Sequence, residues 1–426
     1  MNKTAVIKKL AVFLVTIPSL AQAASTPLHW DDCFHAAVQK MEIIADQDEL
    51  ILQAHEKHVQ AIGVMLPQVS AIGSNYNLSL PTTAYSSVQS TVQFTVDQPL
   101  FRGFRDYAGL RQTGDSTEAA KQTKQRALVQ LYQSVATAFF QVLAAERDIA
   151  NVDSEEKLYQ KQIDQLNEWL KIGRSRKADV IQTQSQSAQL LATLEASRDQ
   201  LNTARESLAY LTGLDQEVPI EDSFPPHFNA SLGPLSDYLS SIEHRPEIVA
   251  ASLNQNAAEE GVLIAKGAHL PSVDLVGDVY ALRTGVSPYG NGSGSWDVLL
   301  SLSLPIFSGG VTQSQVRAAV SQYRENELFV SQDRRLADQE IRTYWKRVHD
   351  DEAQVKALAV AKNLAWESYQ QEMKDYGQSM ATNIDALQSL TSFTTTERSL
   401  DQVRFQKRID YLYLQAATGK TKEIPY

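Results

Sequence analysis

The sequence predicts a chain of mixed class that combines membrane-type β-strands with α-helices far longer than a globular domain contains. Four short stretches alternate apolar and polar residues, and helical patterns of about seventy residues follow each pair of them. The whole arrangement occurs twice along the chain, after an N-terminal export signal. These observations indicate a wall of strands that crosses a membrane and then continues as a helical tube.

Residues 1–23 are expected to form a cleaved signal peptide. Three lysines precede an apolar run from Leu10 to Leu20, and Ala21-Gln22-Ala23 supplies the small residues of a cleavage site. The formal net charge of the chain is −11, and removing these three lysines makes it −14. This acidic balance argues against a nucleic acid partner, because phosphate binding requires clustered Lys and Arg.

The mature chain is expected to contain no membrane-spanning helix, because no stretch approaches about eighteen uninterrupted apolar residues. An exported chain of this kind is either soluble or a β-barrel. Cys33 is the single cysteine, which excludes an internal disulfide, and the preceding Trp30-Asp31-Asp32 lacks the small, apolar residues of a lipoprotein signal. We expect Cys33 to be a buried thiol near the start of a helix.

Landmarks recur in the same order in the two halves. Leu66-Pro67 and Leu270-Pro271 open strand patterns, Pro99-to-Gly103 and Pro305-to-Gly309 close the hairpins, and Thr-Gly pairs end the helical parts. The offset is 204 positions at the first landmark and 206 at the other two. We therefore expect a first repeat at 24–213, a Pro-rich linker at 214–243, a second repeat at 244–420 and a short tail at 421–426, with Pro246 in the first turn of a helix.

The strand patterns place apolar residues on one face, which is expected to contact lipid. The residues that alternate with these apolar ones are Gln, Thr, Ser and Asp. A tilted strand of about twelve residues is long enough to cross the hydrocarbon layer of a membrane. In the first strand of the second half, Val273, Leu275, Val279 and Ala281 share that face. Trp296 either belongs to an interfacial aromatic belt or fills inter-strand contacts. The expected lipid-facing residues are Val88, Val92, Phe94, Val96, Trp296, Val298, Leu300 and Leu302.

The helical segments predict antiparallel coiled-coil packing. The segment from Gly103 to Gly173 would extend about 105 Å as one helix. In the helix that returns from it, Leu194, Leu201 and Leu208 recur every seven residues. A single chain contributes four strands, which cannot close a barrel, and open sheet edges are not tolerated in lipid. Several copies must therefore pool their strands, and a pore favours three or more because about eight strands leave an interior filled by side chains.

The chain resembles the TolC family of outer-membrane channel-tunnel proteins. The resemblance covers about residues 28–420 and rests on the duplication and on motifs in a fixed order. These are Pro-Leu-Phe-Arg-Gly at 99–103, Gly-Arg-Ser-Arg-Lys-Ala-Asp-Val at 173–180, Arg-Pro-Glu at 245–247 and Leu-Pro-Ile-Phe-Ser-Gly-Gly at 304–310.

The resemblance implies a homotrimer in the outer membrane of a Gram-negative bacterium. Four strands per protomer would form one twelve-stranded β-barrel, continued by a periplasmic α-helical barrel with coiled-coil tips. Its partners would be outer-membrane lipid, a periplasmic adaptor protein and an inner-membrane transporter of RND, ABC or MFS type.

The same resemblance implies that the periplasmic tips dock the adaptor. The family pattern of Gly followed six residues later by Asp-Val matches Gly173, Asp179 and Val180. The second half departs from it, because Gly377 lies eight residues before Asp385. Keeping the 206 offset puts Ser379 opposite Gly173, and we expect the second turn to be two residues longer.

Asp385 is the candidate for an acidic ring at a closed tunnel mouth, again by resemblance. Three copies held close together would repel, and a cation or a shifted pKa would relieve this. The family's next acidic position is Gln388 here, which would make the ring thinner. The other interpretation is that Asp385 caps or solvates the start of a helix.

The function expected is a passive exit duct without catalysis, cofactor or resident metal. His55-Glu-Lys-His58 has its histidines three apart rather than four, which favours solvated histidines over a zinc motif. A periplasmic adaptor with a coiled-coil hairpin is the alternative, but it leaves the repeated strands unexplained. A secreted enzyme would need an active constellation, and the sequence offers none. Multidrug efflux and type I protein secretion use the same kind of duct, so the sequence leaves the cargo open.

Overall fold

The computed structural model describes residues 27–79, 86–225, 228–284 and 294–419. The expected signal peptide and C-terminal tail lie outside the described residues. The elements in chain order are α1 (Trp30–Lys40), α2 (Glu42–Gly63), β1 (Gln68–Ser79), β2 (Ser86–Arg102), α3 (Arg105–Lys171), α4 (Lys177–Thr212), α5 (Leu235–Leu239), the 3-10 helix η1 (Ile242–His244), α6 (Pro246–Gly267), β3 (Ser272–Arg283), β4 (Ser295–Ser303), α7 (Val311–Gly377) and α8 (Asn383–Ala417).

The element bounds repeat along the chain with the offsets of the sequence landmarks. Helices α3 and α7 are each 67 residues long, α2 and α6 are each 22, and β1 and β3 are each 12. The first residues of α3 and α7 are 206 positions apart, and those of α2 and α6 are 204 apart. Each residue of the first half therefore has a defined counterpart in the second.

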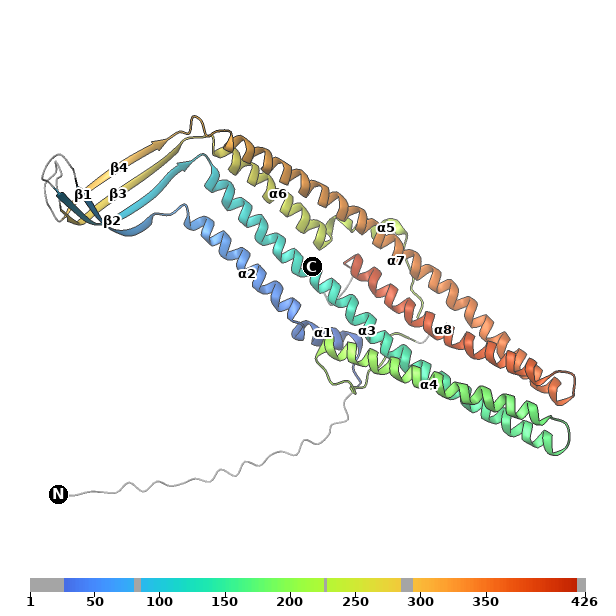
Figure 1. Ribbon diagram of the computed structural model, residues 1–426. Helices are drawn as coiled ribbons and strands as arrows, with labels where there is room; N and C mark the ends of the chain where they lie inside the picture. Colours follow the sequence, from blue (N-terminus) through green and yellow to red (C-terminus); the bar gives the residue numbers. More distant parts are fainter. Residues whose placement is uncertain (1–26, 80–85, 226–227, 285–293, 420–426) are drawn as a thin grey trace, which may run out of the picture.

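The molecule is elongated, with the sheet at one end and two helix-to-helix turns at the other (Figure 1). Helix α3 packs against α2 and α4 on one side and against α6 and α8 on the other, while α7 packs against α6 and α8. The side-by-side order is thus α2/α4, α3, α6/α8, α7. One edge of this curved layer is formed by α2 and α4, and the other by α7 alone.

The sheet is antiparallel, with strand order β1-β2-β3-β4. Val96 of β2 lies opposite Val69 of β1 and Gly277 of β3, and Gly277 lies opposite Val298 of β4. Facing residues in antiparallel pairs share one side of a sheet, so the apolar sets of the four strands form one continuous face. The outer edges, along β1 and β4, are unpaired within the described chain.

One residue of the predicted apolar face needs correction. A register shift between Val92 and Gln93 places Leu282, not Ala281, opposite Val92. Such a shift arises where one strand carries an extra residue, and it reverses the alternation beyond that point. Val88 lies in β2 opposite Asn77, but its side chain is outside the described part of the structure.

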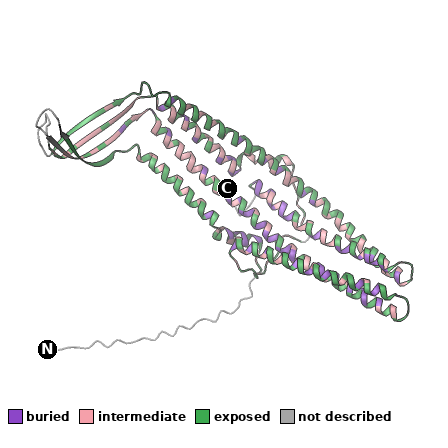
Figure 2. Ribbon diagram, in the orientation of Figure 1, coloured by how far each residue is buried: buried purple, intermediate pink, exposed green. Residues whose placement is uncertain are grey.

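The main core lies midway along the molecule, where α1 packs against α3 and α4 (Figure 2). The ring of Tyr132 meets Trp30 edge-on, with 4.4 Å between ring centroids, and Phe34 at 5.4 Å. Cys33 is fully buried in this cluster, as predicted, and burial raises the pKa of its thiol to about 12. The thiol is consequently protonated and inert.

Helix α3 is more apolar than the sequence analysis allowed. It contains an 18-residue window of mean hydropathy 1.3, so by length and composition α3 qualifies as a membrane-crossing helix. In the structure, however, 61% of that window is buried against other parts of the chain. The core position of α3 accounts for its apolarity, because a buried helix is apolar on more than one side.

The linker at 214–243 is not wholly irregular, because it contains α5 and the start of η1. Its residue Ile220 forms a parallel β-bridge with Leu28. Buried basic residues of α8 hold it from the other side: Arg408 forms an ion pair with Asp222, and Lys407 donates to the carbonyl of Phe228. The linker therefore connects the start of α1 to α8 midway along the molecule.

The Arg-Pro-Glu segment opens α6 through a buried ionic network. Pro246 occupies the first turn of α6, as predicted. Arg245 is 4% exposed, and its Nη2 lies 2.5 Å from carboxylate oxygens of both Glu247 and Glu340. Since Glu340 belongs to α7, the motif joins α6 to α7 where the second half of the chain begins.

Candidate functional site

The two faces of the sheet differ sharply in chemistry. On one face Phe94 is 52% exposed and Trp296 is 71% exposed, although both are large apolar side chains. On the other face Asp278 accepts hydrogen bonds from Gln93 at 3.1 Å and from Thr95 at 2.5 Å. An apolar face backed by a hydrogen-bonded polar face suits a wall between lipid and water.

The predicted lipid-facing residues of β4 all lie on the exposed apolar face. Val298, Leu300 and Leu302 are 60–70% exposed. Trp296 lies opposite Val279, so it continues the same face rather than filling a gap between strands. Leu299, on the other face, is also exposed. The polar face of β4 is therefore not uniformly polar, which the simple alternation did not predict.

The two helix-to-helix turns at the far end have the same hydrogen bonds. Gly173 N donates to Leu170 O and Arg174 N to Trp169 O, at 3.1 and 2.8 Å. The counterparts repeat them, with Ser379 N bonded to Tyr376 O at 2.9 Å and Met380 N to Asp375 O at 2.8 Å. Ser379 therefore occupies the structural position of Gly173, in agreement with the 206 offset.

The expectation of a longer second turn is wrong. Five residues, 172–176, join α3 to α4, and five residues, 378–382, join α7 to α8. Gly377 is the last residue of α7 and does not shape the turn. A Cβ on Gly377 would lie 3.1 Å from the ring of Trp169, so its small size serves packing between the two coiled coils.

Ser379 holds a left-handed backbone conformation that favours glycine. Its φ is 61°, close to the 74° of Gly173. Such a conformation costs a residue with a Cβ about 1–2 kcal/mol. We expect Ser379→Gly to stabilise this turn by about 1 kcal/mol, because glycine relieves the strain but loses more chain entropy on folding. Protease cleavage at the turn should slow in Ser379→Gly and stay unchanged in Ser379→Ala; equal effects of the two substitutions would contradict the strain.

Asp179 binds together elements of both coiled coils. Its side chain receives Arg176 Nη2 at 2.8 Å and the hydroxyl of Tyr376, from α7, at 3.1 Å. Burial raises the pKa of Asp179, but hydrogen bonds from Arg176 and Tyr376 outweigh burial and hold the pKa below its usual value. The carboxylate is thus ionised at neutral pH, and it accepts a hydrogen bond from a different helical hairpin.

Asn383 supplies a second link at the tip. Its amide donates to Asp179 O and to Thr183 Oγ1, each at 3.3 Å, and accepts from Gln162 at 3.1 Å. Asn383 is 1% exposed. A buried amide with all these partners is costly to separate, so the first turns of α4 and α8 are held side by side.

Burial divides the predicted tip residues into two groups. Asp179 and Val180 are 3% and 6% exposed. Val180 packs with Leu166 and Tyr376 in a small apolar cluster. Gly173 and Ser379 are exposed. The turn backbones, rather than the Asp-Val pair, therefore form the surface available to another protein.

Asp385 is exposed and caps α8. Its Oδ2 accepts from Thr382 N at 2.8 Å and from Thr382 Oγ1 at 2.6 Å. These hydrogen bonds lower the pKa of Asp385, and the reciprocal bond from Asp385 N to Thr382 Oγ1 completes a capping box. Within one chain Asp385 therefore acts as a helix-capping residue, as one of the two interpretations predicted. The other, an acidic ring, would require Asp385 side chains from several chains to approach one another.

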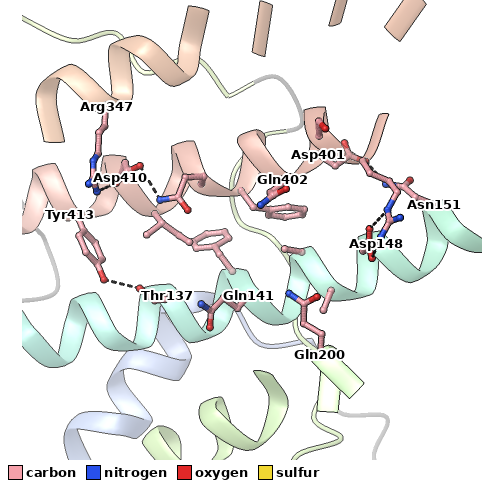
Figure 3. A pocket seen from close by; sticks show the side chains of 18 of the residues that line it. Thr137, Gln141, Asp148, Asn151, Gln200, Arg347, Asp401, Gln402, Asp410 and Tyr413 are labelled. Atoms are coloured by element: carbon pink, nitrogen blue, oxygen red, sulfur yellow. Dashed lines mark hydrogen bonds and ion pairs between the residues drawn. The ribbon is translucent and has the colours of Figure 1, made fainter. Parts of the chain in front are cut away.

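A polar seam joins α3 to α8 above the tip. Arg147 pairs with Asp401 at 2.7 Å, and Arg398 pairs with Asp148 at 2.6 Å. The seam borders a cavity of about 600 Å³ between α3, α4, α7 and α8. Figure 3 shows Asp148 and Asp401 at one end of this cavity, Arg347 and Asp410 at the other, and glutamine side chains between them.

Two buried carboxyl groups face each other across α7 and α8 beside this cavity. Asp351 and Asp410 are 8% and 2% exposed, and Asp351 Oδ2 has no hydrogen-bond partner in the described structure. Arg347 lies 3.6 Å from Asp410 and is itself largely exposed. Burial, followed by the nearby Asp410, raises the pKa of Asp351 to about 6.

The histidine pair does not form a metal site with neighbouring residues. His58 Nδ1 lies 3.1 Å from the hydroxyl of Thr113. Within the described ranges, no three His, Cys, Asp or Glu side chains are grouped so as to hold a metal ion.

Tyr376, Asn383 and the seam residues were not among the predicted site residues. Tyr376 and Asp179 are 197 positions apart, and Asp148 and Arg398 are 250 apart. Each residue taken alone is an ordinary polar position on a long helix. Only the side-by-side order of the helices brings them together, and no local pattern encodes that order.

Comparisons with known proteins agree with this geometry. Residues 53–214 and 238–420 match a family model described as outer membrane efflux protein. The outer membrane protein TolC of Escherichia coli is 24% identical over 402 residues, covering 89% of this chain and 79% of TolC. The proteases secretion protein PrtF of Dickeya chrysanthemi is 20% identical, covering 98% and 93% of the two chains. A crystal structure of CusC superposes with a TM-score of 0.84 at 16% identity, covering 94% and 95%.

Proposed function

The chain belongs to the outer membrane efflux protein family, and on that premise we propose that it is the exit duct of a tripartite export system. The apolar sheet face fits outer-membrane lipid, and the long helices fit a periplasmic tunnel. The duct is not an enzyme, so energy has to enter through an inner-membrane transporter. The alternative of a periplasmic adaptor is not supported by the comparisons, since relatives such as TolC are outer-membrane proteins by name.

The working form that we propose is a homotrimer. Open edges along β1 and β4 cannot remain unpaired in a bilayer, and they are the two ends of the same sheet. Three copies of the four-stranded sheet would supply twelve strands, enough to leave an open interior, whereas two copies would supply eight, whose side chains would fill it. Apolar side chains also remain exposed at both edges of the helical layer, among them Val59 on α2 and Leu328 on α7.

Pore formation by an oligomer is the observation that tests this proposal. Protein purified from outer membranes in mild detergent should migrate as a trimer that heating converts to monomers. The same material should form ion-conducting pores in planar bilayers. A monomer that fractionates with periplasmic proteins and forms no pores would exclude the duct.

The partners that we propose meet the tip. The exposed turns around Gly173 and Ser379 would contact the periplasmic adaptor, and the adaptor would link them to a transporter of RND, ABC or MFS type. The matching family is described by efflux, and one relative is named for the secretion of proteases. The transporter that feeds the duct would determine which cargo passes.

An acidic ring of three Asp385 residues is the proposed constriction. Asp385 is exposed and ionised, and only its Oδ2 is engaged in the capping box, so Oδ1 remains available to a cation. We expect Asp385→Ala to lose block by divalent cations in single-channel recordings. Asp385→Asn, which keeps the cap oxygen without the charge, should behave in the same way. Unchanged block in both variants would leave Asp385 as a helix cap only.

A further inference from the structure

The free edges of the helical layer correspond to each other through the internal repeat. Within the chain, α3 of the first half packs against α6 of the second. The counterpart of α3 is α7, and the counterpart of α6 is α2. These two helices lie at opposite edges of the layer (Figure 1). If copies close into a ring, α7 of one copy meets α2 of the next with the geometry that α3 and α6 show here.

An ion pair in the α3–α6 contact has a complete counterpart. Arg111 Nη2 lies 2.7 Å from Glu260 Oε1, and the Glu260 side chain is 7% exposed. Adding 206 to Arg111 gives Arg317 on α7, and subtracting 204 from Glu260 gives Glu56 on α2. Both are exposed, and neither has an ion-pair partner among the described residues. We propose that Arg317 of one protomer pairs with Glu56 of a neighbouring copy, and that this pair fixes how far α7 of one copy is shifted along α2 of the next.

A close backbone contact repeats in the same way. A Cβ on Gly103 would lie 2.4 Å from the carbonyl oxygen of Gly267, so only glycine permits the approach of this loop to the end of α6. The counterparts are Gly309 and Gly63, and both are glycines with nothing within 4 Å of an added Cβ. Two further glycines at the predicted places support a second tight crossing, between copies, just below the sheet.

The sheet register extends the same rule into the membrane. Val96 lies opposite Gly277 within the chain. The counterparts are Leu302 on β4 and Gly73 on β1, and both strands are free on that side. The ring thus closes with Leu302 of one copy opposite Gly73 of the next, which keeps the apolar face continuous around the barrel.

Contacts within the chain no longer have matching counterparts between copies in the half of the molecule nearer the tips. The counterparts of Tyr376 and Asp179 are Leu170 and Asp385, and a leucine cannot donate a hydrogen bond. The seam residues Asp148 and Arg398 correspond to Gln354 and Ala192, which carry no charge and cannot form an ion pair. Polar links near the tip therefore hold helices together within a protomer. The Arg317–Glu56 pair, in contrast, holds neighbouring protomers together in the half of the molecule nearer the sheet.

Charge reversal in the full-length protein tests the pair, and the inference rests on the homotrimer proposed above. Arg317→Glu and Glu56→Arg should each lower the temperature at which purified trimers dissociate, by a few degrees. The double variant, with the charges exchanged, should recover most of the loss. Arg324→Glu is the matched control on α7, because its counterpart Glu118 pairs, among the described residues, with Lys121 of its own helix and not with a residue of α6.

The outcomes separate the interface from the function. Failure of the exchanged double variant to recover, or an equal effect of Arg324→Glu, would overturn the pair while wild-type trimers and pores still supported the duct. Absence of wild-type trimers would instead overturn the proposed function. As a second readout, a protein that carries both Arg317→Cys and Glu56→Cys should be joined to its neighbouring copies by a short bifunctional thiol reagent, whereas either cysteine alone should not; a double-cysteine protein that remains uncross-linked would also count against the interface.

Discussion

Channels that carry Tyr376→Phe should open more readily than wild-type channels. The hydroxyl of Tyr376 donates to Asp179 Oδ2 and accepts from the hydroxyl of Ser175 across the two coiled coils, each at 3.1 Å. A hydrogen bond to a charged group contributes about 1.5–3 kcal/mol, and a buried carboxylate that loses a donor keeps its desolvation cost. The population with separated tips should rise by about tenfold to hundredfold. Single-channel recording would detect it as higher mean conductance.

Further substitutions distinguish the loss of the tip clamp, meaning the hydrogen bond of Tyr376 to Asp179, from a general destabilisation of the helices. Asp179→Asn removes the charge that Arg176 and Tyr376 share, and it should open the channel at least as much. Tyr323→Phe is the matched control on α7, because its hydroxyl accepts from Gln255 of α6 at 3.3 Å, in the upper half. If Tyr323→Phe raises conductance as much as Tyr376→Phe does, the effect does not come from the tip.

In the proposed trimer, the tip hydrogen bonds and the interface between copies would place the mobile part of the duct at the end farthest from the sheet. Tip contacts such as Tyr376 with Asp179 lie within one protomer, and their counterparts between protomers lack the necessary donors. Protomers joined firmly through α2, α7 and the sheet would therefore remain together while the lower coiled coils move. Opening by breaking a few hydrogen bonds at the tip requires no rearrangement of the membrane part.

Much of the architecture follows from residue patterns alone. Alternation in β2 and β4 identified the apolar face because side chains on a strand repeat every two residues. The recurrence of Leu-Pro and of Phe followed by Gly gave the repeat offsets, and the 206 offset placed Ser379 correctly at the turn. These features are local, or they compare one segment with another, so a sequence is sufficient to show them.

Other features depended on contacts that no local pattern contains. Ala281 was misplaced because a bulge needs the register of the neighbouring strand. The extra length expected for the second turn arose from treating Gly377 as the turn residue, whereas Ser379 accepts the strained conformation itself. Tyr376 was overlooked because its partner Asp179 lies on another helical hairpin, and the tip acts through that pairing.

The carboxyl pair at Asp351 should make the α7–α8 packing pH-dependent. The pKa of Asp351 in the folded protein is about 6, above its ordinary value, so the folded state binds the proton more tightly than the unfolded chain. Stability is then greatest in mild acid and falls as the pH rises from about 4 to about 6, remaining lower above that. The charged groups around it are Asp410, Asp350 and the exposed Arg347, and one arginine does not neutralise a pair of buried carboxylates.

Asp351→Asn should abolish this dependence, because asparagine resembles the protonated carboxyl group. At neutral pH the variant should be more stable than wild type by about 2–3 kcal/mol, the equivalent of roughly two pKa units. Thermal unfolding of the detergent-solubilised protein at several pH values would measure it. Asp350→Asn is the matched control: the Asp350 side chain is 53% exposed, and this substitution should change the pH profile far less than Asp351→Asn does. A wild-type profile that is flat between about pH 4 and pH 7, or one that Asp351→Asn leaves intact, would show that the pKa of Asp351 is not raised in the folded protein.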